Sequence, residues 1–182
     1  YYPGGSPFDT QSVGFSWSEN FWCNLLNDDA LNGKNNDAKP IALTGFMVLC
    51  ISLAYFWWMF PWYVQCETKY ALTIRICGVL SMLLALLLCT NIDHDLVTGA
   101  AGFFGLLAMS GVMTALYKND WKTLFYFGMV NILLIAVNNI LYYSPDLIWY
   151  LPVVQKITFV TILAWVSSIT LKIFWGYSEK PV

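Results

Sequence analysis

Five long apolar segments constrain this chain more than any other feature of its sequence. They cover residues 41–64, 70–89, 96–117, 123–143 and 153–175. Each is close to the ~20 residues that a helix needs to cross the ~30 Å hydrocarbon core of a bilayer. Backbone groups in lipid must find partners within their own segment, so continuous apolar runs of this length form helices. The sequence therefore predicts an all-α integral membrane protein with five transmembrane helices.

The low content of charged residues agrees with a membrane location. Only 11% of the residues are charged, whereas soluble domains contain about 25%. The net charge of −2 argues against a nucleic-acid partner, which requires a basic surface. The sequence contains no glycine-rich phosphate loop and no C-x-x-C pair, and from these motifs we expect neither a cofactor nor a metal.

Short links between the apolar segments predict how the helices are arranged. Neighbouring segments are joined by residues 65–69, 90–95, 118–122 and 144–152. Links of this length make consecutive helices antiparallel neighbours, as in an up-and-down bundle. A tail of residues 1–39 precedes this bundle of residues 40–175, and residues 176–182 follow it. A cleaved signal sequence or a sixth span before residue 1 would each explain an outward tail. Tyr1, Tyr2 and Pro3 are typical of the interfacial end of a helix, so we favour the sixth span.

Lysine and arginine residues predict the orientation in the membrane. One side of the bundle carries Lys69, Arg75, Lys118, Lys122, Lys172 and Lys180, and the other carries Lys34, Lys39 and Lys156. The side richer in these residues faces the cytoplasm. We therefore expect an outward N-terminal tail and a cytoplasmic C-terminus. Arg75, about one turn inside the cytoplasmic end of its span, is expected to extend toward the interface.

The N-terminal tail carries a helix signal of its own. Ser16 and Glu19 have the spacing of a capping box, and the apolar residues that follow share one helical face. They are Phe21, Trp22, Leu25 and Leu26. We therefore expect a short interfacial helix over residues 16–26 on the outer membrane surface.

Several tail motifs and one acidic motif resemble a known family. The tail motifs are Tyr2-Pro3-Gly4-Gly5, Gly14-Phe15-Ser16-Trp17, Phe21-Trp22-Cys23-Asn24-Leu25-Leu26 and Ala30-Leu31-Asn32-Gly33. Asp93-His94-Asp95 leads into a span rich in glycine and alanine. Together they resemble a bacterial family of six-span membrane proteins of unknown function, itself loosely similar to the Frag and DRAM group. The resemblance implies a location in a bacterial inner membrane and a first span before the tail, and it brings no established activity.

Asp93, His94 and Asp95 form the only acid–histidine cluster, at the outer start of the third span. One interpretation is a site for a metal ion or a lipid headgroup. The other is helix capping, because acids at a helix N-terminus pair with free backbone N–H groups. His94 is the only histidine, which excludes zinc sites built from several histidines.

Three further polar residues are expected at a similar depth in the outer half of the bundle. Asn138 and Asn139 lie in the fourth span, where interhelical hydrogen bonding and the lining of a ligand pocket are alternative roles. Lys156 enters the fifth span, where it either extends to the interface or pairs with an outer aspartate. With Asp93, His94 and Asp95 these residues form a hypothetical outward-facing polar pocket.

Two cysteines are predicted on the outer side, and Cys23 in the tail is a candidate disulfide partner of Cys89 at the end of span two. Buried free thiols are the alternative. For the whole chain, the favoured function is a non-catalytic membrane protein that binds lipids or a partner subunit. The alternatives are a membrane enzyme that acts on a lipid headgroup through Asp93, His94 and Asp95, and a small transporter.

Overall fold

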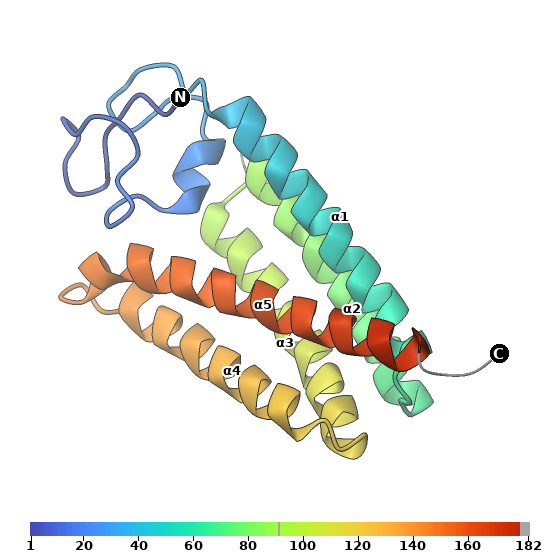
Figure 1. Ribbon diagram of the computed structural model, residues 1–182. Coiled ribbons are helices and arrows are strands. Elements are labelled where there is room, and N and C mark those ends of the chain that lie inside the picture. The colour runs from blue at the N-terminus through green and yellow to red at the C-terminus, as the bar shows by residue number, and fades with distance from the viewer. Residues whose placement is uncertain (91, 179–182) are drawn as a thin grey trace. The chain divides into compact units, whose positions relative to one another are not determined.

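The computed structural model describes residues 1–90 and 92–178, which form a mostly irregular N-terminal tail followed by helices joined by short links (Figure 1). The long helices are α1 (Lys39–Tyr63), α2 (Thr68–Leu86), α3 (His94–Lys118), α4 (Lys122–Tyr142) and α5 (Leu151–Ser178). The short 3-10 helices among the described residues are η1 (Trp22–Leu26), η2 (Leu87–Cys89) and η3 (Ile148–Tyr150). In the described part of the chain no strand forms, only two isolated β-bridges.

The predicted all-α fold is confirmed. Within residues 1–90 and 92–178, five helices are long and apolar enough to cross a membrane, and each coincides with one of the apolar segments. α5 continues to Ser178, past the predicted end of the last span at residue 175. Lys180 and the last residues of the predicted C-terminal tail lie outside the described residues.

Local chemistry explains where the helices begin and end. The carboxylate of Asp93 accepts a hydrogen bond from the backbone N–H of Leu96 at 2.8 Å, which caps the first turn of α3. At the other end of α3, Asp120 adopts a positive φ of 61°, a conformation that aspartate tolerates better than most residues. The chain can therefore reverse within the few residues that lead to α4.

The chain divides into two compact units. The first contains Tyr1–Phe46 and Val130–Thr161, and the second contains Met47–Met129 and the chain from Ile162 onward. The helices α1, α4 and α5 each pass from one unit into the other.

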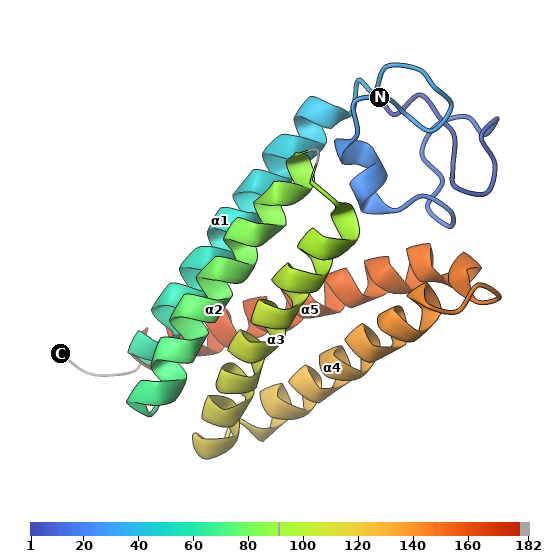
Figure 2. The same cartoon turned by 180° about the vertical axis from the view of Figure 1, so that it is seen from behind.

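In the second unit, small residues let helices approach closely. Figure 2 shows α2 and α3 side by side, and the Ser81 hydroxyl on α2 donates to the Ala101 carbonyl on α3 at 2.7 Å. A Cβ on Gly111 of α3 would lie 2.6 Å from Ile74 of α2, so only glycine fits there. The same holds for Gly78, which packs directly against an indole ring of α1. Close packing through small residues is how membrane helices associate without a hydrophobic driving force.

In the first unit, the predicted helix over residues 16–26 is wrong in its first half. The helix of the tail is η1 (Trp22–Leu26). The expected capping pair of Ser16 and Glu19 is not what starts it, because the Glu19 carboxylate accepts a hydrogen bond from the Ser6 hydroxyl at 2.7 Å. Glu19 therefore ties two loops of the tail together.

Buried asparagines hold the irregular part of the tail. The fully buried Asn20 donates from its amide to the Gly5 carbonyl at 2.8 Å, and its side-chain oxygen accepts from the Ser16 N–H at 2.8 Å. Asn36, also buried, donates to the Asn27 carbonyl at 2.9 Å. An irregular chain needs such partners because backbone groups removed from water must be paired.

Candidate functional site

Lys156 is the charged residue that the structure places most unexpectedly. It lies in the first unit near the start of α5 and is only 8% exposed. Its ammonium donates to the Asn20 carbonyl at 2.5 Å and to the Pro152 carbonyl at 3.0 Å. The ammonium also lies 5.6 Å from the centre of the Phe15 ring, within the range of a cation–π contact. Lys156 therefore binds the tail through backbone oxygens and an aromatic face, and neither role predicted from the sequence describes it.

Aromatic pairs extend the contact between the tail and α5. Trp22 of η1 meets Phe159 of α5 edge to face at 5.2 Å, and Phe8 stacks on Trp149 of η3 at 3.9 Å. Figure 1 shows η1 beside the first turns of α5. Such pairs contribute about 0.5–1.5 kcal/mol each beyond the apolar area that they bury. The tail is thus a folded layer docked on α5, and we call this set of contacts, together with those of Lys156, the tail–α5 contact.

Asn138 and Asn139 have different roles within the first unit. The amide of Asn138 donates to the Thr158 hydroxyl on α5 at 2.6 Å and to the Leu134 carbonyl at 2.8 Å. Asn139 is exposed, and its amide donates to the Ile135 carbonyl of its own helix at 2.9 Å. Asn138 therefore joins α4 to α5, as expected for interhelical hydrogen bonding.

Asp93, His94 and Asp95 belong to the second unit. Asp93 caps α3, and His94 is half exposed with its Nδ1 3.6 Å from the Asp95 carboxylate. The use of Asp93 as a cap favours the capping interpretation for that residue. Asn138, Asn139 and Lys156 lie in the other unit, so the outward pocket that joins all six residues stays a prediction.

The two candidate disulfide cysteines also lie in different units. Burial raises the pKa of the Cys23 thiol in η1 above its ordinary value, and the nearby Lys156 charge opposes that rise. Cys89 closes η2 in the second unit. The disulfide between them stays a prediction.

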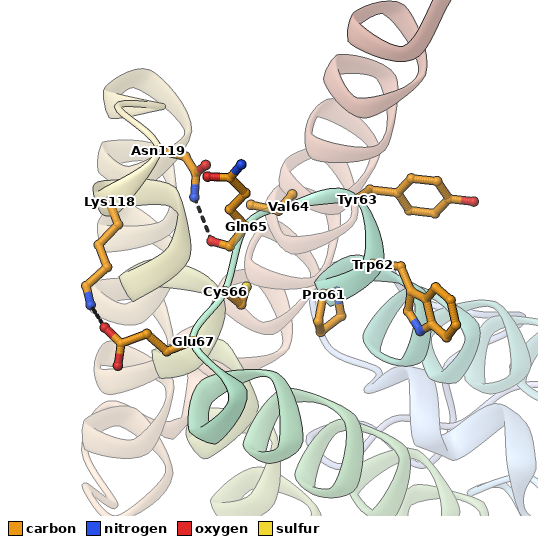
Figure 3. Close-up of a pocket in the computed structure, with 9 residues that line it drawn as sticks. All are labelled: Pro61, Trp62, Tyr63, Val64, Gln65, Cys66, Glu67, Lys118 and Asn119. Atoms are coloured by element: carbon orange, nitrogen blue, oxygen red, sulfur yellow. Dashed lines mark hydrogen bonds and ion pairs between the residues drawn. The ribbon is translucent and has the colours of Figure 1, made fainter.

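A pocket of about 700 Å³ lies in the second unit where α1 turns into α2 (Figure 3). The residues that line it are Pro61, Trp62, Tyr63, Val64, Gln65, Cys66, Glu67, Lys118 and Asn119. Lys118 forms an ion pair with Glu67, and the Asn119 amide donates to the Gln65 carbonyl at 2.9 Å. These contacts hold the link between α1 and α2 against the end of α3.

The electrostatics of this pocket follow from its pairing. The hydrogen bond from Lys118 lowers the pKa of the Glu67 carboxyl, so that carboxylate is ionised near neutral pH. Burial raises the pKa of the Cys66 thiol, and the positive charge of Arg75 opposes the rise. The charges of Lys118 and Glu67 therefore compensate each other at one side of the pocket, and the positive charge of Arg75 acts on Cys66. Sequence reasoning missed this pocket, although Pro61 and the short link after it mark the place where α1 must end.

Comparisons with models of protein families, with curated proteins and with solved structures found no match. The family expected from the sequence motifs stays a prediction, and the functional interpretation rests on the contacts within each unit.

Proposed function

We propose that this chain is a non-catalytic, multi-pass membrane protein whose folded N-terminal tail binds a partner subunit at the membrane surface. In this proposal the tail faces the outside of a bacterial inner membrane and the C-terminus faces the cytoplasm. The excess of lysine and arginine on the opposite side supports that orientation.

The observation that carries the proposal is the hydrogen bond from Lys156 to the Asn20 carbonyl. Fixing the backbone of one residue costs about 1–2 kcal/mol in conformational entropy, so an ordered tail of this length requires strong internal contacts. A buried ammonium bonded to two carbonyls supplies one of them, because hydrogen bonds from charged donors are stronger than neutral ones. A surface held in this way is preorganised for binding, which reduces the entropy lost on association.

The exposed side of the tail has the residues of a binding surface. Trp17 is 69% exposed and Val13 is 95% exposed. The Trp17 ring packs edge to face on Phe15 at 5.6 Å, and Phe15 in turn lies over the Lys156 ammonium. Exposed tryptophan on a rigid support is the residue type that most often dominates binding energy at protein interfaces.

The proposal is tested by photo-crosslinking in native membranes. A benzophenone amino acid is placed at Trp17 or, as a control on the same tail, at the exposed Lys34. We expect one discrete protein adduct from position 17 and none of that mass from position 34. The adduct is expected to weaken when Lys156→Met is added, because the tail then loses its anchor. Lipid adducts alone at position 17, or the same protein adduct from both positions, would contradict the proposal.

A further inference from the structure

Arg75 is the only charged residue within the apolar segment of α2. It lies seven residues after Thr68, where α2 begins, which places it about 10 Å along the helix at 1.5 Å per residue. A guanidinium stays protonated at any physiological pH. A permanent charge at this depth requires partners, and intramembrane charges therefore mark functional positions.

Two tryptophans of α1 hold the guanidinium within the second unit. The Arg75 Nε donates to the Trp58 carbonyl at 3.1 Å. The guanidinium carbon lies 5.7 Å from the centre of the Trp58 ring and 5.4 Å from that of Trp62. Trp58 and Trp62 are one helical turn apart and so share a face of α1. Pro61 lies in the same turn, and its missing N–H removes the helical donor for the Trp57 carbonyl, which lies next to that of Trp58.

The arrangement leaves most of the guanidinium available. Its Nε–H is one of five donors, and the described residues offer no further acceptor within hydrogen-bond distance and no carboxylate within 4.0 Å. Trp58 and Trp62 are 52% and 69% exposed. The paired Nη groups therefore belong to an open aromatic site that carries a positive charge without an anion.

We propose that Arg75, between Trp58 and Trp62, binds the phosphate of a membrane phospholipid. Guanidinium groups bind phosphate oxygens through two parallel hydrogen bonds, and tryptophan favours the headgroup level of the bilayer. Trp62 also lines the pocket of about 700 Å³, which offers space for the rest of a headgroup. A soluble phosphate compound shares this chemistry and differs in lacking acyl chains. The site is independent of the partner surface proposed for the tail.

Native mass spectrometry of the full chain, loaded with phosphatidylglycerol in detergent, tests this site. Arg75→Gln removes the charge, and Lys122→Gln is the matched control, because Lys122 is a 65% exposed cation in the same unit. We expect lipid retention to fall about tenfold in Arg75→Gln, as for the loss of a charge-assisted hydrogen-bond pair, and to stay unchanged in Lys122→Gln. Equal retention by the two variants overturns the proposal.

Further arms separate folding from binding and lipid from soluble phosphate. Trp62→Leu keeps the charge and removes one ring, so an intermediate loss supports the aromatic site, and full retention overturns the role of the ring. Retention of diacylglycerol as strong as that of phosphatidylglycerol overturns phosphate recognition. Millimolar inorganic phosphate is added to each chain. If it displaces the lipid from the native chain and from Lys122→Gln but not from Arg75→Gln, the site is an anion site that takes soluble phosphate.

Discussion

The Lys156 ammonium lies 2.5 Å from the Asn20 carbonyl, a contact between residues 136 positions apart in the sequence. It places the positive charge of a transmembrane helix on the backbone of the N-terminal tail. Because Asn20 is itself fully buried and bonded to Gly5 and Ser16, the contact connects α5 to the centre of the tail. Structure and proposed function therefore depend on the same pair.

Asn20→Ala is expected to loosen the tail. The change leaves the Ser16 N–H without its partner and the Gly5 carbonyl with only the Tyr2 hydroxyl, which costs about 2 kcal/mol, or a roughly 30-fold increase in local opening. Hydrogen exchange of the Gly5 and Asn36 amides, both of which donate within the tail, measures the effect. Asn35→Ala is the control, since Asn35 is exposed. Equal exchange in the two variants would refute the role of Asn20.

Gly78→Ala is expected to destabilise the second unit by about 1–3 kcal/mol, the usual cost of overpacking. A Cβ at this position would lie 2.3 Å from the Trp57 ring, whereas a Cβ on Gly99 of α3 would meet nothing within 4 Å. Gly99→Ala is therefore expected to be neutral or slightly stabilising, because alanine favours the helix. Thermal unfolding in detergent distinguishes the two. A melting temperature for Gly78→Ala at or above that of Gly99→Ala would contradict the packing described for α1 and α2.

At a pH near the ordinary thiol pKa of about 8.5, the Cys23 thiol is expected to react with iodoacetamide more slowly in the folded chain than in the denatured chain. Burial raises its pKa in the folded tail, so less thiolate forms than in the unfolded chain. The sign for stability follows: the unfolded thiol ionises first, so the tail loses stability as the pH rises above that ordinary value. Mass spectrometry of alkylated peptides follows the rate with and without denaturant. A folded rate equal to the denatured rate would refute this environment, and complete protection that only a reductant removes would instead support the disulfide with Cys89.

Thr10→Cys is expected to react with a membrane-impermeant maleimide on intact cells, and Lys122→Cys only after the cells are opened. Both positions are exposed, and each is placed in a chain whose native cysteines are alanine. The reason is the excess of lysine and arginine on the side of Lys122. Labelling of position 122 from outside would reverse the orientation.

The five helices were predictable because the signal that marks them is local and long. An apolar run of about 20 residues has no other stable conformation in a bilayer, so neighbouring sequence alone identifies it. The cap at Asp93 was also predictable, because it depends on residues within one turn.

The tail–α5 contact was not predictable in the same way. Lys156 binds a backbone carbonyl, and every residue of the chain has such a group. Nothing in the sequence therefore marks Asn20 as the partner of Lys156. The capping box at Ser16 failed for a related reason, since Ser6 binds Glu19 from another loop. The pocket beside Pro61 likewise depends on how the link to α2 folds against Lys118 and its neighbour.

Hydrogen exchange of Lys156→Met in lipid nanodiscs tests the central claim most directly. Lys172→Met is the matched control. Lys172 lies on the same helix as Lys156, but it belongs to the second unit and contacts Trp121 of that same unit. We predict that Lys156→Met speeds exchange of the Gly5, Ala30 and Asn36 amides about tenfold or more, the cost of leaving a buried carbonyl unpaired, while Lys172→Met leaves them unchanged. Unchanged exchange of these tail amides in Lys156→Met would contradict the account.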